Sequence, residues 1–211
     1  RLVGSEMCIR DSLYMADLSF RSALLKKDKH TCQNILSYKL LVHQLVQCLN
    51  DLIFVSVSTI KNGTAEIPPV CLINSIKNFI GDNRNHPSKV LLEFAVDYLF
   101  EFDFRENDQS VLDETVKDGI GQTAFLGDLE DACQAGTWIE AESLAAKIFM
   151  ASDQSRGTLD ALAELALQDV DRNRLVVFQI FSAFNFQESK KDTWTFIKCI
   201  LDQIAGDALQ A

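Results

Sequence analysis

Apolar residues recur along most of the chain at intervals of three and four positions, which places them on one face of an α-helix. This spacing predicts, among others, helices over residues 31–60, 88–103, 138–149 and 172–185. Only 3 Pro and 9 Gly are present among 211 residues, and their scarcity favours long helices over a turn-rich β-fold. We therefore expect an all-α fold, a multi-helix bundle or a short irregular helical-repeat stack, of roughly eight helices.

The longest predicted helix, over residues 31–60, carries leucine, isoleucine and valine on one broad stripe. His43 lies in the middle of this apolar segment, in YKLLVHQLVQCLN. The β-branched end of the segment, LIFVSVSTI, would also suit a strand, but no partner strand is evident, so we predict that the helix continues. Asn62 and Gly63 then form a typical stop signal at its C-terminus.

The helix predicted over residues 88–103 divides its side chains between a buried side and a solvated ridge. The buried side is expected to hold Val90, Leu91, Phe94, Ala95, Tyr98, Leu99 and Phe102. The ridge, with residues four positions apart, consists of Glu93, Asp97, Glu101 and Arg105. We expect no metal site; the three acidic residues of the ridge are the candidates for binding a cation or a basic partner, and a solvated helix face explains their spacing equally well.

The second half of the chain contains a predicted αα-hairpin. Gly136 ends one helix, and Thr137 begins the next with Glu140 three positions later, which is the sequence of a capping box. Two helices joined by so short a turn pack antiparallel. The segment ACQAGTWIEAESL resembles the hairpin of tetratricopeptide-type repeats at Ala132, Gly136, Trp138 and Ala141. The resemblance covers one hairpin, and no period of about 34 residues can be followed through the chain.

The helix predicted over residues 172–185 differs from the others because LVVFQIFSAF is apolar almost all round. A helix without a polar face is stable only when it is covered on every side. We therefore predict that this helix lies at the centre of the fold.

The first residues do not fit the helical pattern. One choice of codons for Leu2 to Asp11 reproduces the adapter and mosaic-end DNA of transposase-based sequencing libraries, and chance does not explain a match of that length. We expect residues 1–14 to be an adapter-derived, non-native tail and the native chain to start at Met15.

The helical pattern is interrupted a second time at Gly119 and Gly121. This break predicts an N-terminal helical subdomain over residues 15–118 and a C-terminal helical subdomain over residues 119–211.

Charge is distributed unevenly around a formal net value of −10. Residues 15–89 carry nine Lys or Arg against five Asp or Glu, whereas residues 90–211 carry nine against twenty-three. The acidic part repels phosphate groups, so we expect no nucleic-acid binding there, and we expect the two parts to pair with each other. The candidates for an anion or RNA site in the basic part are Arg21, Lys26, Lys27 and Lys29.

The cysteines after residue 15 are odd in number, widely spaced and surrounded by apolar residues. This pattern predicts buried free thiols in a reducing compartment, and the absence of CxxC weakens a zinc or redox hypothesis. The longest strongly apolar run, Leu52 to Val57, is far shorter than the roughly 20 residues that cross a bilayer. We therefore expect a cytoplasmic protein with no membrane association.

No catalytic motif is found in the sequence. The histidines at 30, 43 and 86 lack metal-binding spacing, and DVDRNR lacks the glycine and glutamate that a calcium loop needs. His43 is the most notable titratable group, since a neutral imidazole could ligate a metal or cofactor or act as a base. A helix-surface or hydrogen-bonded core histidine explains it as well, and we expect no cofactor.

These patterns favour a soluble helical protein-interaction or scaffold domain that binds a protein partner and has no catalytic motif. The alternative is a small-molecule- or cofactor-binding helical enzyme. Its pocket would lie between helices, and its dispersed site would combine His43 with a cysteine or carboxylate from another segment.

Overall fold

The computed structural model describes residues 19–41, 43–60, 68–106, 108–118, 124–187 and 190–206. Within these residues the chain consists of helices and short connections, and the only β-type pairing is an isolated bridge between Thr59 and Phe104. The predicted all-α fold is confirmed. The predicted tail, the start at Met15 and the breaks at residues 62–63 and 119–121 lie outside the described residues.

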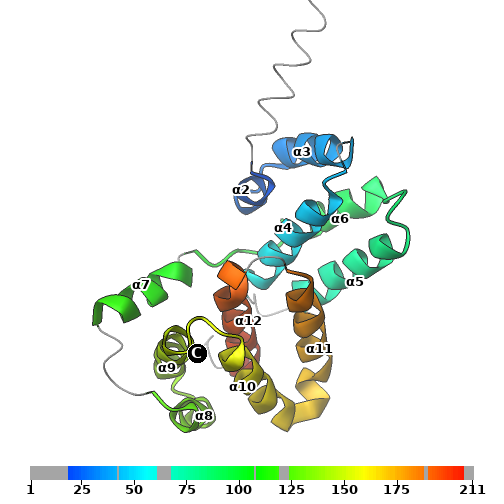
Figure 1. Cartoon of the computed structure of the whole chain (residues 1–211). Helices are drawn as coiled ribbons and strands as arrows, with labels where there is room; N and C mark the ends of the chain where they lie inside the picture. The colour runs from blue at the N-terminus through cyan, green and yellow to red at the C-terminus, as the bar shows by residue number, and fades with distance from the viewer. Residues whose placement is uncertain are drawn as a thin grey trace, which may run out of the picture.

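The first group of helices is built around two antiparallel pairs (Figure 1). Its members are α2 (Phe20–Leu25), α3 (Lys29–Leu41), α4 (Leu45–Val57), α5 (Pro69–Asp82) and α6 (Lys89–Leu99). Helix α4 packs against α5, α3 packs against α6, and the short α2 covers α3 and α4.

The second group follows a connection that crosses the molecule. Its members are α7 (Asp108–Asp118), α8 (Leu126–Ala135), α9 (Trp138–Ala151), α10 (Gly157–Ala166), the 3₁₀ helix η1 (Leu167–Asp169), α11 (Val170–Phe186), the 3₁₀ helix η2 (Lys190–Asp192) and α12 (Thr193–Ala205). Helices α8 and α9 form the predicted hairpin, and α7 packs against α9 and α12. The subdomain boundary after residue 118 stays a prediction.

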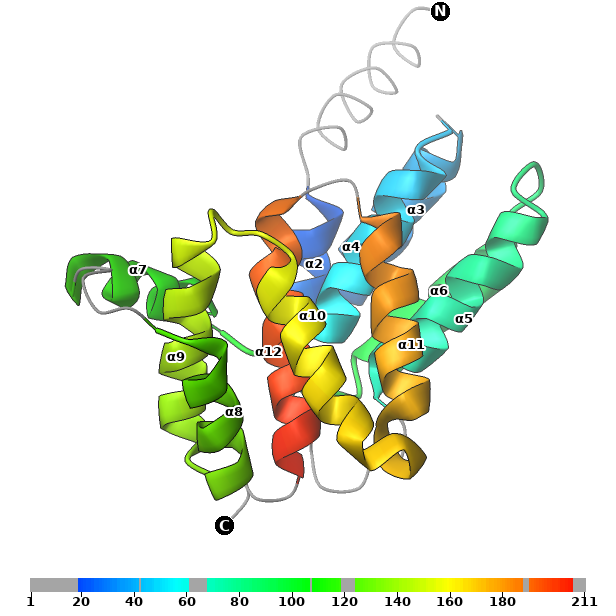
Figure 2. The same ribbon diagram turned by 60° about the horizontal axis from the view of Figure 1, so that its bottom comes forward.

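The helix at the centre is α12, and not α11 as the sequence predicts. Helix α12 packs against α4, α7, α9, α10 and α11, and Figure 2 shows it between the α8–α9 hairpin and α11. Helix α11 buries Val176, Val177 and Ile180 on one side, whereas Leu175 and Phe178 on the other side are 50% and 67% exposed. The apolar circumference of α11 is therefore only partly covered by the chain itself.

The helix predicted over residues 31–60 is interrupted in the structure. Helix α3 ends at Leu41 and α4 begins at Leu45, and the backbone N–H of Gln44 donates to the carbonyl of Lys39 at 2.9 Å. His43 lies in this turn with φ 57°, in the left-handed region, and is exposed. The expectation that His43 lies inside a helix is wrong. The apolar run is divided between two helices, α3 and α4, which pack against different partners. The preference for helix over strand in LIFVSVSTI is confirmed as far as Val57.

The helix predicted over residues 88–103 is shorter and rotated. It ends at Leu99, and its buried residues are Leu92, Ala95, Val96 and Leu99. Val90 and Phe94, both expected to be buried, are exposed. Helix α6 contacts α3, α4 and α5. These contacts bury only part of its apolar side chains, so the buried stripe is narrower than the sequence predicts.

The turn of the α8–α9 hairpin depends on glycine rather than on the predicted capping box. Thr137 makes no side-chain cap for α9; its hydroxyl donates instead to the carbonyl of Ala132 at 3.2 Å. Gly136 adopts φ 73° and ends α8 in the left-handed conformation, as the sequence predicts. A residue with a Cβ is strained there because the Cβ approaches its own carbonyl.

We expect Gly136→Ala to lower the free energy of unfolding by about 1 to 2 kcal/mol, because alanine disfavours the left-handed region. The matched control is Gly127→Ala inside α8, where an added Cβ meets nothing within 4 Å. That control should raise the free energy of unfolding by about 0.5 to 1 kcal/mol, since alanine restricts the unfolded chain. Urea denaturation of both variants measures the two signs. Equal changes in the free energy of unfolding for the two variants would contradict a left-handed conformation at Gly136.

Candidate functional site

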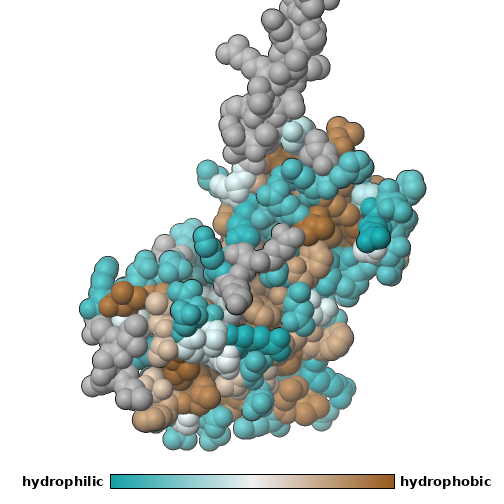
Figure 3. Space-filling view, in the orientation of Figure 1, coloured by the Kyte–Doolittle hydropathy of each residue, from teal (hydrophilic) through white to brown (hydrophobic). Residues whose placement is uncertain are grey.

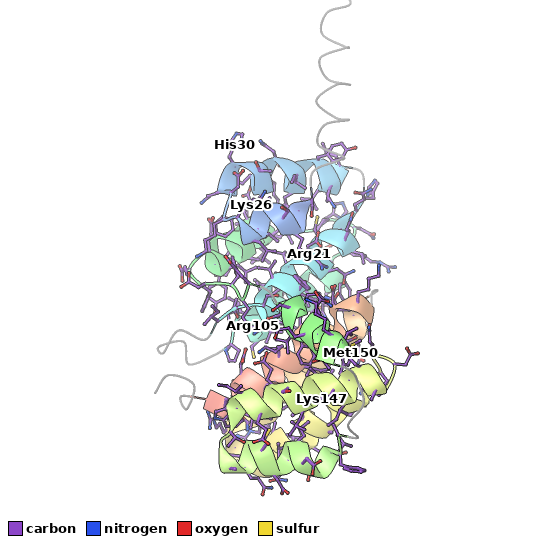
Figure 4. The ribbon with its side chains drawn as sticks, turned by 90° about the vertical axis from the view of Figure 1, so that its left-hand side faces the viewer. Arg21, Lys26, His30, Arg105, Lys147 and Met150 are labelled. Carbon is purple, nitrogen blue, oxygen red and sulfur yellow. The ribbon has the colours of Figure 1, made fainter. Side chains whose placement is uncertain are left out.

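Arg105 occupies a buried position between the two groups of helices. It follows the Thr59–Phe104 bridge, and its backbone N–H donates to the carbonyl of Ser58 at 2.7 Å. The N–H of Ile60 donates to the carbonyl of Asp103 at the same distance, so two backbone bonds fix this crossing. The Arg105 side chain is only 11% exposed. The extended segment thus directs a guanidinium into the interior (Figure 4).

The Arg105 guanidinium bonds to three separate parts of the fold. Its Nε donates to Asp108 Oδ1 at 3.0 Å, and its Nη1 donates to Asp202 Oδ2 at 2.6 Å. The remaining donors reach the backbone carbonyls of Val57 at 2.7 Å, Thr195 at 3.3 Å and Thr59 at 3.4 Å. The beginning of α7, the end of α4 and the length of α12 are therefore joined through one side chain.

The pKa shifts of the charged groups at Arg105 agree with these hydrogen bonds and ion pairs. Burial alone would lower the pKa of Arg105, but the Asp202 and Asp108 carboxylates outweigh burial and raise it. Burial raises the pKa of Asp202 more than Arg105 and Lys198 lower it. Because a buried charge needs partners, these groups neutralise one another inside the protein. The arrangement fixes the fold and leaves no unpaired donor on Arg105 for a ligand.

A small cavity borders the Arg105 network. Its volume is about 40 Å³, which suits one or two water molecules. It is lined by Thr59, Ile60, Pro68, Pro69, Phe102, Arg105, Val176, Cys199, Asp202 and Gln203. None of the candidate residues from the sequence is among these lining residues.

A second arginine makes a similar set of bonds in the upper part of the molecule (Figure 4). Arg21 binds Asp192 through two parallel bonds of 3.0 Å and donates to Asp51 at 3.1 Å. Its guanidinium also stacks 3.8 Å from the ring centroid of Phe54. Burial raises the pKa of Asp51 more than Arg21 lowers it. Helix α2 is thereby joined to α4 and to the start of α12.

The expected pairing of the basic and acidic parts is confirmed for three of the four anion-site candidates. Besides the Arg21–Asp192 pair, Lys27 binds Asp103 at 3.4 Å and Lys29 binds Asp97 at 2.7 Å. Lys26, the fourth candidate, is exposed.

The acidic ridge on α6 is a solvated surface in the described residues. Glu93 pairs with Lys89 at 3.6 Å, Asp97 pairs with Lys29, and Glu101 is exposed beyond the end of the helix. Arg105 does not continue the ridge, because the helix has already ended. Across the described part of the chain, no three His, Cys, Asp or Glu residues are grouped so as to hold a metal ion.

His43 remains a separate surface group in the structure. It lies in the α3–α4 turn, and the hypothesis that it belongs to a dispersed site stays a prediction.

The sequence pattern did not identify Arg105 as a buried residue, although the sequence contains a signal for its position. The alternation in FDFR is typical of an extended segment and is incompatible with a helix that continues to residue 103.

The five cysteines among the described residues are free thiols, as the sequence predicts. Cys32, Cys48, Cys71 and Cys133 are buried, and Cys199 is partly buried. Burial raises the pKa of Cys32, Cys48 and Cys199 to about 12, and that of Cys71 and Cys133 to about 11. A thiol protonated to this extent at neutral pH is a poor nucleophile.

Several large apolar side chains are exposed on and next to α11. Leu167 in η1 and Val170, Leu175 and Phe178 in α11 are all exposed. Asp171 and Arg174 lie among them and pair at 3.3 Å, both open to solvent. We call these six residues the α11 face. In Figure 3, apolar residues reach the surface of the lower part of the molecule, where Figure 1 places α10 and α11.

Comparison with known proteins gives no relative for this arrangement. No family model matches the chain, and neither a curated protein nor a solved structure matches it. Among the described helices, none is long and apolar enough to cross a membrane. The geometry of the site is therefore the basis for any functional proposal.

We expect Arg105→Met to lower the free energy of unfolding by about 3 to 5 kcal/mol, because it leaves buried carboxylates without a partner. Adding Asp202→Asn should restore part of that loss by removing one of the unpaired charges. Lys29→Met is the control, since its half-exposed pair with Asp97 contributes less than about 1 kcal/mol. Chemical denaturation at pH 7 measures all three. A loss from Arg105→Met no larger than the control would contradict the network.

The raised thiol pKa values predict alkaline destabilisation. The unfolded chain ionises its thiols near pH 9, whereas Cys48 in the folded protein keeps its proton to about pH 12. Between these values the folded state binds more protons, so the free energy of unfolding falls as pH rises, by up to about 1.4 kcal/mol per pH unit for each thiol. Cys48→Ala should make the decline shallower above pH 9. Denaturation from pH 7 to 11 under a reductant tests this, and parallel curves would contradict it.

Proposed function

We propose that the chain is a protein-interaction or scaffold domain, and that the α11 face is the surface that contacts a protein partner. The observation that carries this proposal is the exposed apolar side of α11. A helix that is apolar almost all round is normally buried. Helices α5, α10 and α12 cover part of α11, and the side with Leu175 and Phe178 is left open.

Approximate free energies of apolar burial support binding of moderate affinity at this surface. Complete burial of one large apolar side chain contributes about 1.5 to 3 kcal/mol. Four such side chains, each already partly buried, would contribute roughly half of the full sum, or about 3 to 6 kcal/mol. Association itself costs at least about 4 kcal/mol in lost freedom of motion. The α11 face therefore suits a reversible partner whose binding also uses the residues around it.

The charged groups and thiols fit the same proposal. Arg21, Lys27 and Lys29 are paired with internal carboxylates, which supports a protein partner rather than a nucleic acid. Free buried thiols support a reducing, cytoplasmic location. The alternative, an enzyme with a site at His43, has less support because His43 is an isolated surface residue and the cavity at Arg105 has a volume of only about 40 Å³.

A site-specific photo-crosslinker tests the proposed surface. Benzoylphenylalanine at position 178 should form protein adducts in cells that express the chain, because a partner covers Phe178. The same group at position 79 is a matched control, since Phe79 is 66% exposed and Phe178 is 67% exposed. Adducts are counted by gel shift and mass spectrometry. Equal labelling at the two positions, or none at 178, would refute the proposed contact surface.

A further inference from the structure

We propose that the exposed side of α6 binds an arginine-bearing, amphipathic helix of a partner protein. This surface lies on a different helix from the α11 face, so the inference goes beyond the proposed function. Two observations carry it. The described part of the chain leaves aromatic, apolar and acidic side chains of α6 uncovered beside one another, and the same protein already holds one of its own arginines with that combination of groups.

The side of α6 that points away from the protein carries apolar and acidic residues together. The buried side of the helix packs against α3, α4 and α5. On the other side, Val90 is 74% exposed and Phe94 is 50% exposed. Glu93 follows Val90 by three positions and Asp97 follows Phe94 by three, and residues at this spacing are neighbours on a helix surface. The exposed side therefore complements a partner that is both basic and partly apolar.

Two aromatic rings of α6 are each followed by a carboxylate three positions later. The rings of Phe94 and Tyr98 are stacked, with centroids 6.3 Å apart and 24° between their planes. Asp97 follows Phe94, and Glu101 follows Tyr98. The chain still turns at Glu101, because its backbone N–H donates to the carbonyl of Tyr98 at 3.2 Å. Burial and the nearby Glu101 carboxylate raise the pKa of Tyr98. The two ring–carboxylate pairs thus lie about one helical turn apart.

Arg21 shows how this protein holds a guanidinium with such a pair. On α4, Asp51 and Phe54 are also three positions apart, in the reverse order. The Arg21 guanidinium lies 3.8 Å from the ring centroid of Phe54 and donates to Asp51 at 3.1 Å, and Asp192 accepts two further bonds. A planar guanidinium stacks on a ring while its edge donates to a carboxylate, and an ammonium group lacks this geometry. The pairs on α6 therefore suit arginine better than lysine.

The carboxylates of α6 are available to a partner. Glu101 is exposed and has no ion pair among the described residues. Asp97 pairs with Lys29 and Glu93 pairs with Lys89, but these four side chains are 33% to 54% exposed. Exposed pairs of this kind contribute little stability, so an arriving arginine can share or replace the lysines. The net charge of −10 also attracts a basic partner from a distance.

The length of α6 sets the expected affinity. Its 11 residues span roughly 16 Å, so the contact is smaller than the 800 Å² or so that each partner buries in a standard interface. One arginine of the partner would lie against each ring–carboxylate pair, and an apolar residue would cover Val90. We therefore expect a reversible complex with a Kd on the order of 10 to 100 µM at low ionic strength, weakened by added salt.

A synthetic peptide of Leu-Ala-Ala-Arg repeats, roughly four helical turns long, tests this surface. Its leucines and arginines alternate at spacings of three and one, which places them on one side of a helix. Fluorescence anisotropy of the labelled peptide with the full chain should show saturable binding. A peptide with lysine in place of arginine has the same charge and should bind about three- to tenfold more weakly, because the ammonium group does not stack on the rings in the same way.

A matched pair of double variants locates the binding. Phe94→Ser with Glu101→Gln removes one ring and one carboxylate from α6 and should weaken binding of the arginine peptide at least about tenfold. The control is Phe125→Ser with Glu130→Gln, which makes the same substitutions and the same change in charge at exposed positions in and next to α8. It should bind within about twofold of the wild type. Circular dichroism spectra and melting curves that match the wild type confirm that both variants fold.

Three results would overturn the inference. They are the absence of saturable binding, an equal loss of binding in the two double variants, and equal binding of the arginine and lysine peptides. The last two would mean that the peptide responds only to the overall negative charge. The crosslink at position 178 tests the proposed function separately. Peptide binding at α6 without adducts at 178 refutes only the α11 face as a contact surface, and the reverse result refutes only the inference about α6.

Discussion

The guanidinium of Arg105 donates hydrogen bonds to carbonyl groups at the end of α4 and just beyond it. The last carbonyls of a helix have no partner within it, and those of Val57 and the following Thr59 receive N–H groups from Arg105. A cation at this helix end is also favoured by the helix dipole. The same side chain holds Asp108 and Asp202, so the start of α7 and the central α12 depend on one buried charge.

Helix α12 is bound to the first group of helices near both of its ends. Asp192 precedes its first turn and binds Arg21, and Asp202 in its last turns binds Arg105. Between them, the apolar residues of α12 fill the space among five other helices. Apolar packing alone would allow α12 to slide or rotate, whereas two ion pairs with fixed geometry specify one register. Of the two pairs, Arg21–Asp192 joins the basic part of the sequence to the acidic part, whereas Arg105–Asp202 lies within the acidic part.

Local patterns predicted the helices well, because helical spacing and glycine stops act within a few residues. The all-α class, the α8–α9 hairpin and the free thiols follow from such patterns. The errors at His43, Val90 and α11 share one cause: an apolar stripe shows that a surface is buried and does not show by what. Apart from Asp108, three positions away, the partners of Arg105 lie 46 to 97 positions away, and the spacing in a single sequence contains no signal at that range. The alternation in FDFR indicates an extended segment but does not identify those partners.

The place of α12 after all the other described helices has a consequence during synthesis. Arg105 leaves the ribosome 97 residues before Asp202, and Arg21 leaves it 171 residues before Asp192. At about 5 to 20 residues per second, the first interval lasts roughly 5 to 20 s. Throughout that time the earlier helices lack their central packing surface, and their apolar sides remain open to molecular chaperones. The core formed by the described helices is therefore completed only when α12 has been synthesised.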